Sequence, residues 1–212
     1  MNALKDGQFI LFIGDSITDC GRRGQNAPYG DGYVALFREL MIARHPERKI
    51  TVINKGIGGN KVTDLEGRWE DDVMRHRPDW LSIKIGINDL HSHLLNTQYA
   101  VPPDSFASVY EAILKRTLAV WKPKLILISP FYISRDFSSG SFRSQVLELL
   151  PRYIEPVKHL SEQSKARYVP LHDIFQKHLE YREPDDFCPE PVHPHRAGHL
   201  VIAEAVMAAL ET

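Results

Sequence analysis

The chain has 212 residues, 43% of them hydrophobic, and its 26 Lys and Arg residues nearly balance its 27 Asp and Glu residues. This length suits a single α/β domain over residues 1–212, because domains usually contain about 100–200 residues. A formal net charge of −1, with the two signs interspersed, argues against a protein that holds nucleic acid or an acidic membrane through bulk charge. Composition therefore favours a small-molecule partner.

The N-terminal region and the cysteines indicate where the protein works. The apolar run Phe9–Ile13 is shorter than the roughly 7–15 residues of a signal-peptide core. Nothing in the sequence approaches the roughly 18 apolar residues of a membrane span. Two cysteines, Cys20 and Cys188, cannot build a disulfide framework, so we expect reduced thiols and a cytoplasmic protein. A single bond between these two cysteines is the alternative.

Short Ile-, Leu- and Val-rich runs alternate with helical patterns along the chain. A buried parallel strand is predicted at each of Phe9–Ile13, Ile50–Ile53, Leu81–Ile85, Leu125–Ile128 and Tyr168–Pro170. Apolar spacing near 3.6 predicts a helix from Asp104 to Trp121 and a final helix over Ala197–Leu210. Pro151 and Pro156 predict a break or a new helix start. Such alternation predicts a doubly wound parallel sheet with right-handed crossovers.

Polar or glycine-rich segments follow three of these strands, and another precedes the last helix. They are Gly14–Asp19, Asn54–Asn60, Gly86–Asp89 and Glu190–His193. In open α/β sheets, ligands bind outside the carboxyl ends of the strands. We therefore expect these segments to converge on one rim and to form the functional site.

The residues of this rim suit nucleophilic catalysis. A serine hydroxyl such as that of Ser16 needs a base, and His193 is the best candidate, with Glu190 holding its other ring nitrogen across an E-x-x-H turn. The N–H groups of Ser16 and Gly59 and the side-chain amide of Asn88 would stabilise an oxyanion. Each feature alone is common, since a serine after a strand more often caps a helix. Their order along the chain, Ser then acid then His, is that of other α/β hydrolases.

These segments resemble the blocks of the SGNH (GDSL-type) hydrolase superfamily: GDSITD, the glycine of GIGGN, GIND and acid-x-x-His. The resemblance extends from Gly14 to His199. It is strongest to a bacterial subgroup that includes acetylxylan esterases, through GDSITDCGR, GYVAL, NKGIGGN, DLEGRW, PDWLSIKIGIND, PFYI and HPHRAGH. It implies a flavodoxin-like, three-layer α/β/α sandwich with a mostly parallel five-stranded sheet. It also implies cofactor-free acyl-ester hydrolysis through Ser16, with His193 as base and Gly59 and Asn88 as oxyanion donors.

The sequence departs from the subgroup at several positions. Its acid is normally Asp, whereas position 190 is Glu; Asp185 or Asp186 is the fallback. Lys84 replaces an apolar strand residue, and we interpret it as reaching solvent from the sheet edge. The segment from His91 to Pro103 resembles the subgroup poorly and follows Asn88, so we expect it to line the pocket.

Asp15, Trp69 and Tyr132 are candidate substrate-binding residues. Trp69 and Tyr132 have rings that stack on sugars, although core packing is the alternative for each. The resemblance implies that Asp15 and Asp19 lie beside the nucleophile, where both would also brace the turn.

Subgroup resemblance favours acetyl as the acyl group and small acetylated xylo-oligosaccharides as substrates. One alternative is a broad short-chain lipolytic esterase of non-sugar esters, and another is a carbohydrate-binding relative whose catalysis is impaired by Glu190. A metal-dependent hydrolase is less favoured, because H-E-x-x-H is absent from the sequence; its ligands would be His91, His93, His193, His195 and His199. We expect no metal and no cofactor, and uncovered apolar surface would allow a homo-oligomer.

Overall fold

A computed structural model describes residues 3–211 and contains a five-stranded parallel sheet in the order β2-β1-β3-β4-β5. The strands are β1 Phe9–Gly14, β2 Thr51–Gly56, β3 Trp80–Lys84, β4 Lys124–Ile128 and β5 Arg167–Val169. Every predicted strand is present, with ends that differ by at most three residues. The strand order is the flavodoxin-like one, which confirms the predicted fold class.

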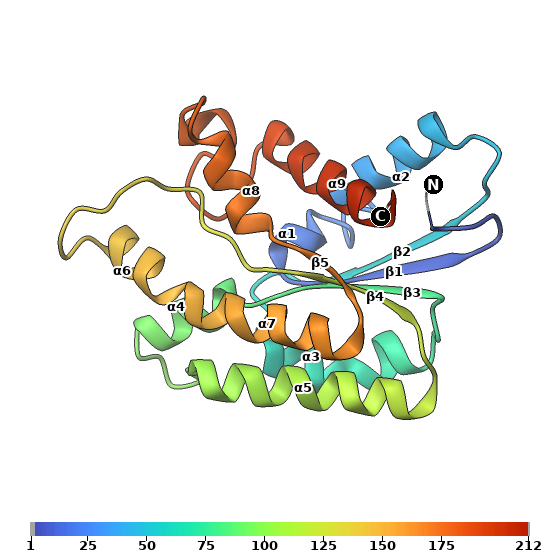
Figure 1. Cartoon of the computed structure of the whole chain (residues 1–212), viewed down its shortest axis with the longest axis horizontal. Coiled ribbons are helices and arrows are strands. Elements are labelled where there is room, and N and C mark those ends of the chain that lie inside the picture. Colours follow the sequence, from blue (N-terminus) through green and yellow to red (C-terminus); the bar gives the residue numbers. More distant parts are fainter. Residues whose placement is uncertain (1–2, 212) are drawn as a thin grey trace.

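The sheet register places the three functional loops at one level. At the end of β1, Gly14 pairs with Gly56 of β2 on one side and with Lys84 of β3 on the other. The segments that follow these strands therefore leave the sheet side by side, at the left edge in Figure 1. This is the edge at which ligands bind in open α/β sheets.

Helices cover both faces of the sheet (Figure 1). One layer contains α1 Ser16–Asp19, α2 Tyr33–Arg44, α8 Leu171–His178 and α9 Arg196–Glu211, and the other contains α3 Val62–Trp69, α5 Pro103–Val120 and α7 Pro151–Ser164. The remaining helical segments are the π-helical turn η1 Glu70–Met74, α4 Ile87–Leu94, α6 Phe142–Leu149 and the 3₁₀ turn η2 Pro184–Asp186. The α/β/α layering implied by the resemblance is confirmed.

The predicted helices are present with small differences. The helix expected from Asp104 begins at Pro103, and the last helix begins at Arg196. Pro151 starts α7, as a proline at the first helical position should, because its missing N–H would lack a partner there anyway. Pro156 lies inside α7 and does not end it, so the expected interruption occurs at Pro151 alone.

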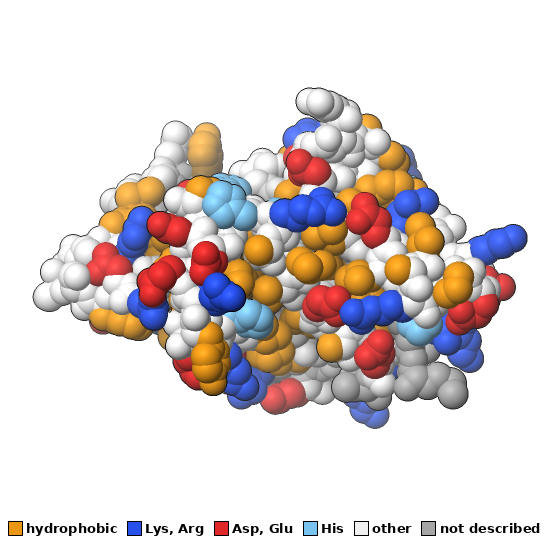
Figure 2. All heavy atoms as spheres, turned by 90° about the horizontal axis from the view of Figure 1, so that it is seen from above, with side chains coloured by type: hydrophobic (Ala, Val, Ile, Leu, Met, Phe, Trp, Pro, Cys, Tyr) orange, Lys and Arg blue, Asp and Glu red, His pale blue; other side chains and the backbone are white. Residues whose placement is uncertain are grey.

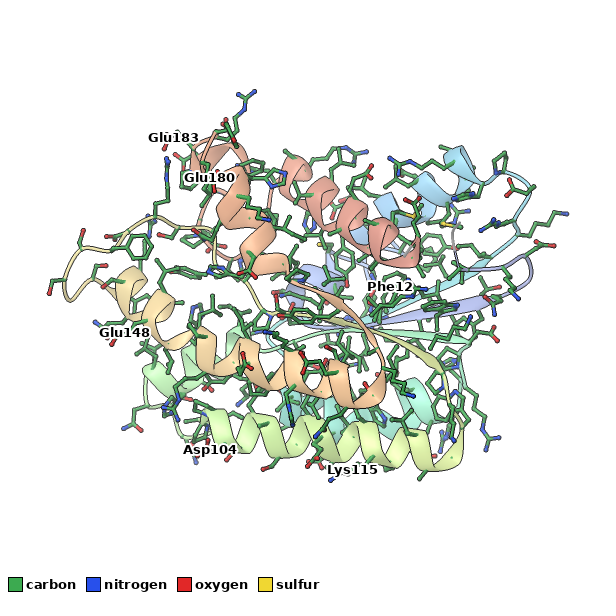
Figure 3. All side chains as sticks on the ribbon, viewed as in Figure 1. Phe12, Asp104, Lys115, Glu148, Glu180 and Glu183 are labelled. Carbon is green, nitrogen blue, oxygen red and sulfur yellow. The ribbon has the colours of Figure 1, made fainter. Side chains whose placement is uncertain are left out.

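The core lies on both sides of the sheet, and every residue of β3 is buried. Phe12 of β1 packs edge-on against Tyr33 and Phe37 of α2, with ring centroids 5.8 and 5.1 Å apart (Figure 3). On the opposite side, Asp104 and Lys115 project outward from α5 (Figure 3). Phe106, Tyr110 and Ile113 of the same helix are buried, as expected for a helix that covers a sheet.

The surface carries mixed charge. On the face formed by α2, α8 and α9, acidic and basic side chains are interspersed with apolar ones (Figure 2). Of the helices that the structure describes, none has the length and apolarity needed to cross a membrane. Cys20 and Cys188 are both free thiols, so the alternative of a bond between them is wrong for this structure.

Candidate active site

Ser16 is the first residue of α1 and directly follows β1. Asp15 caps the helix, because its carboxylate accepts a hydrogen bond from the N–H of Ile17 at 3.0 Å. The end of β1 lies very close to the end of β3, because a Cβ on Gly14 would be 2.2 Å from the carbonyl oxygen of Lys84. Ser16 is partly exposed, and its N–H has no acceptor within residues 3–211. The helix start therefore offers a hydroxyl and a free N–H together.

The side chains of Ser16, His193 and Glu190 form a hydrogen-bonded chain. Nε2 of His193 lies 2.9 Å from Oγ of Ser16, and Nδ1 of His193 lies 2.5 Å from Oε1 of Glu190. When Nδ1 carries the ring hydrogen and donates a hydrogen bond to Glu190, Nε2 carries no hydrogen. It can then accept the proton of the serine hydroxyl. The fold thus brings together three residues that the sequence pattern proposed as a triad. Asp185 and Asp186, the fallback acids, lie in the exposed turn η2.

Glu190 is held by the backbone as well as by the imidazole. Its carboxylate accepts hydrogen bonds from the N–H of Val192 at 3.0 Å and from the N–H of His193 at 2.8 Å. Burial acts to raise the pKa of Glu190, but these N–H groups and the His193 ring outweigh it and lower the pKa. Glu190 is therefore ionised and oriented toward the ring.

The loop after β2 packs directly onto α1. A Cβ on Gly56 would lie 2.2 Å from the backbone nitrogen of Asp19, and Oδ2 of Asp19 accepts a hydrogen bond from the N–H of Gly58 at 3.0 Å. Gly59 follows with φ +77°, in the left-handed region that favours glycine. Its N–H has no acceptor among the described residues. Asp19 therefore braces this loop, as the sequence suggested.

Asn88 connects the loop after β2 to the start of α4. Its side-chain nitrogen donates a hydrogen bond to the carbonyl oxygen of Asn60 at 3.1 Å. An amide nitrogen carries two hydrogens, so the second remains available to a ligand. Asn88 is partly exposed, while its neighbour Asp89 is buried and accepts a hydrogen bond from the N–H of Val62. The orientation of the Asn88 amide is therefore set by the backbone of the adjacent loop.

Lys84 is buried rather than exposed at an edge. It ends β3, the central strand of the sheet, and its Nζ lies 3.1 and 3.3 Å from the two carboxylate oxygens of Asp15. Both side chains are fully buried. The interpretation that Lys84 reaches solvent from the sheet edge is wrong, because β4 and β1 lie on either side of its strand.

Two of the predicted substrate-binding side chains cannot touch a substrate. Asp15 has no exposed surface, and its carboxylate is hydrogen-bonded to the N-terminus of α1 and to Lys84. Trp69 is also fully buried, and its Nε1–H donates to the hydroxyl of Thr117 on α5 at 2.9 Å. Tyr132 is 3% exposed. These residues belong to the core, which was the alternative for the aromatic pair.

His91 and Phe142 form an aromatic wall, and His91 lies within electrostatic reach of Glu190 and His193. The His91 ring packs edge-on against Tyr132, with centroids 6.1 Å apart, and lies 5.6 Å from the ring of Phe142, which is 41% exposed. Burial lowers the pKa of His91, and the charge of Glu190 opposes this shift, which places the two side chains within electrostatic reach. We define the His91–Phe142 wall by these two residues. The expectation that the segment after Asn88 lines the site is supported at His91.

Two of the five histidines proposed as metal ligands, His193 and His199, have other partners for both ring nitrogens. Both ring nitrogens of His193 contact Ser16 and Glu190, and those of His199 contact the N–H of Tyr33 and the thiol of Cys20. Within residues 3–211, no three His, Cys, Asp or Glu side chains are grouped as metal ligands. Hydrogen bonds within the protein therefore already occupy the rings of His193 and His199.

Arg68 is a structural residue of the site that sequence reasoning passed over. Its guanidinium donates to the carbonyl oxygens of Gly14 and Lys55, at 3.2 and 2.8 Å, and to the side chain of Asn60 at 2.8 Å. It thereby ties together the ends of β1 and β2 and the loop that carries Gly59. The only signal in the sequence was its place within DLEGRW.

A serine at a strand-to-helix turn, with a histidine and a carboxylate behind it, defines a serine hydrolase site. The chain belongs to the GDSL-like Lipase/Acylhydrolase family, whose model matches residues 12–201. It is a serine carboxylic ester hydrolase.

A sequence relative and a solved structure each match nearly the whole chain. An acetylxylan esterase of Geobacillus stearothermophilus is 38% identical over 213 residues, which are 95% of this chain and 93% of that protein. The crystal structure of Axe2, an acetylxylan esterase of the same organism, has a TM-score of 0.89 at 35% identity and covers 99% of this chain and 97% of its own. Catalytic mutants of Axe2 carry alanine in place of a serine, an aspartate and a histidine.

A further solved structure is similar over the same length. LAE5, an α/β hydrolase from the metagenome of Lake Arreo, Spain, has a TM-score of 0.88 at 31% identity and covers 100% of this chain and 98% of its own. The fold and the order of its elements are therefore shared along the whole chain.

Proposed function

We propose that this protein removes short acyl groups, acetyl above all, from small acetylated sugars such as xylo-oligosaccharides, with Ser16 as nucleophile. The observation that carries the proposal is the continuous hydrogen-bonded chain from Ser16 Oγ through His193 to Glu190. The free N–H groups and the Asn88 amide beside Ser16 supply the other requirement of acyl transfer, which is stabilisation of an oxyanion.

The first half of the reaction forms an acyl-enzyme. The Ser16 oxygen bonds to the ester carbonyl carbon while its proton passes to His193 Nε2, and Glu190 stabilises the resulting imidazolium. The carbonyl oxygen becomes an oxyanion that the N–H groups of Ser16 and Gly59 and the amide of Asn88 stabilise. The bond from carbon to the alcohol oxygen then breaks, and His193 returns the proton to the departing alcohol.

The second half regenerates the enzyme. A water molecule bonds to the acyl carbon and gives a proton to His193. The bond from that carbon to Ser16 breaks, the acid leaves, and Ser16 recovers its proton from His193. Atoms and charge balance without a metal or a cofactor.

The open position of the triad suits a bulky alcohol. The side chains of His193 and Glu190 are 58% and 45% exposed, so the leaving group is not confined by protein on every side. The His91–Phe142 wall, whose His91 lies within electrostatic reach of both, presents a half-exposed aromatic ring. Aromatic rings bind the apolar faces of sugar rings, so we assign the alcohol side of the substrate to this wall.

The choice of an acetylated sugar is supported by the similarity to acetylxylan esterase of Geobacillus stearothermophilus. The test compares initial rates on aryl esters of increasing acyl length and on acetylated xylo-oligosaccharides. We expect acetyl esters to be fastest and Ser16→Ala to abolish turnover. Long-chain esters that outpace the acetylated sugars would favour the broad lipolytic alternative, and full activity of Ser16→Ala would overturn the mechanism.

We also propose a cytoplasmic location, which the two free thiols support. Under this proposal the substrates are small esters taken up by the cell. Fractionation of cells that express the full chain tests it. Homo-oligomer formation stays a prediction, which light scattering of the purified protein checks.

A further inference from the structure

A fully buried ion pair lies directly behind the nucleophile. Nζ of Lys84 contacts both carboxylate oxygens of Asp15, at 3.1 and 3.3 Å, and both side chains have no exposed surface. Burying two charges is costly, and replacing such a pair by apolar side chains often stabilises a protein. Stability therefore does not explain the pair, and its position suggests a role in the reaction.

Asp15 fixes the helix that presents Ser16. Its carboxylate accepts the N–H of Ile17 at 3.0 Å, and its backbone oxygen accepts the N–H groups of Thr18 and Asp19 at 3.1 and 2.9 Å. The peptide bond between Asp15 and Ser16 also carries the free Ser16 N–H. The Asp15 carboxylate therefore lies one residue before the Ser16 N–H, which would bind the oxyanion.

An unpaired carboxylate at this position would oppose the reaction. Like charges repel strongly where water is excluded, so an ionised Asp15 alone would destabilise the oxyanion held by the Ser16 N–H. Lys84 supplies the opposite charge, and its Nζ also lies 5.0 Å from the centre of the Phe131 ring. Burial lowers the pKa of Lys84, and the Asp15 carboxylate opposes that shift.

We propose that Lys84 is a positioning residue for ester hydrolysis, which neutralises the Asp15 carboxylate so that it can cap α1 without repelling the oxyanion. The inference rests on the proposed role of Ser16. It goes beyond that role by assigning a function to a strand residue that contacts neither substrate nor triad.

The proposal predicts the sign of three substitutions. Lys84→Met leaves one negative charge beside the oxyanion, Asp15→Asn leaves one positive charge, and the double variant leaves none. Asn is itself a good helix N-cap, so Asp15→Asn keeps the start of α1. A purely structural pair predicts instead that both single variants are impaired alike.

The experiment measures kcat and KM of the full chain for an aryl acetate, with folding checked by near-UV circular dichroism. We expect Lys84→Met to lower kcat about 10- to 100-fold with KM changed less than about threefold. Asp15→Asn should equal or exceed the parent, and Asp15→Asn/Lys84→Met should recover to within about fivefold of it. Lys124→Met, an exposed lysine at the start of β4, is the matched control.

The proposal is overturned if the double variant is no faster than Lys84→Met, or if Asp15→Asn loses as much kcat as Lys84→Met. If Lys84→Met does not fold, the remaining two variants test the proposal. It then requires that kcat of Asp15→Asn is at least as high as kcat of the double variant, and a lower value overturns it. Failure of the proposed function gives a different result, namely an inactive parent or an active Ser16→Ala.

Discussion

One carboxylate oxygen of Glu190 binds His193 twice. Oε1 lies 2.5 Å from Nδ1 of the ring and 2.8 Å from the backbone nitrogen of the same residue, while Oε2 accepts the N–H of Val192. Glutamate has one more methylene than the usual aspartate of the family. The Glu190 side chain accommodates this length by folding back over its own turn. This geometry supports Glu190 as the acid of the proposed triad.

Changes at Glu190 test this arrangement. Glu190→Gln should lower kcat by about 100-fold or more, because an uncharged amide neither stabilises the imidazolium nor enforces the tautomer. Glu190→Asp should cost about tenfold, since the shorter side chain cannot reach both nitrogens of His193 without displacing the loop. Steady-state kinetics on an aryl acetate measure both. Asp186→Asn, in the exposed turn η2, should leave kcat unchanged. A loss of kcat equal to that of Glu190→Gln would indicate that Asp186, and not Glu190, is the acid of the triad.

Removal of the Asn88 amide should reduce kcat with little effect on KM. Deleting one oxyanion donor typically costs about 10²–10³ in kcat, because the hydrogen bond strengthens only as charge develops. Asn88→Ala should fall in this range, whereas Gln163→Ala, an exposed amide on α7, should not change either constant. A rise in KM alone would mean that Asn88 binds the ground state and not the oxyanion.

The His91–Phe142 wall is expected to affect sugar substrates selectively. Phe142→Ala should raise KM for acetylated xylo-oligosaccharides by about 3- to 10-fold, as expected for loss of one aromatic contact, and leave aryl acetate kinetics nearly unchanged. Phe137→Ala removes a similar ring that is 71% exposed in the loop before α6 and serves as the control. Equal effects of the two substitutions would place the sugar elsewhere.

Trp69 is expected to affect stability and not substrate binding. Trp69→Phe leaves a cavity between α3 and α5 and removes the hydrogen bond to Thr117, which should cost about 1–3 kcal/mol. Thermal unfolding measures this loss, and KM for acetylated xylo-oligosaccharides should stay within about twofold of the parent. A selective rise in KM without loss of stability would contradict the burial of this ring.

Asp89 makes the protein less stable as pH rises. Burial raises its pKa from 3.8 to about 7, so between these values the native state binds more protons than the unfolded state, and stability falls with increasing pH. The full effect is at most about 4 kcal/mol. Asp89→Asn, which keeps an acceptor for Val62, should match the parent near pH 4 and be more stable above pH 7.

Urea unfolding at several pH values measures this difference. Asp104→Asn, which alters a carboxylate 98% exposed on α5, should follow the parent at every pH. Burial lowers the pKa of His199 to about 4 and gives the opposite slope, because the unfolded state then binds more protons. His199 is present in both the parent and Asp89→Asn, so its contribution cancels in the difference between their free energies of unfolding. Parallel curves for parent and Asp89→Asn would show that Asp89 does not titrate in this range.

Much of the fold and the core of the site could be predicted from local patterns. Short Ile- and Leu-rich runs mark buried strands wherever they occur, and parallel strands must end at a common edge, so Ser16, Asn88 and the Glu190–His193 turn could be placed together. The misassigned residues were those whose neighbours come from distant segments. Trp69 contacts Thr117 of α5, a residue 48 positions away, and no local pattern indicates that pairing.

The doubly wound sheet and the residue types at its carboxyl edge could be predicted from the amino-acid sequence, because the periodicity of strands and helices depends on neighbours along the chain. Three features became visible in the three-dimensional arrangement alone: Lys84 is buried against Asp15, Glu190 hydrogen-bonds His193, and Arg68 ties the loops together. Burial and ion pairing depend on strand order, which brings β3 to the centre of the sheet. The net charge of −1 does not reveal the buried lysine, whose ion pair with Asp15 lies next to Ser16.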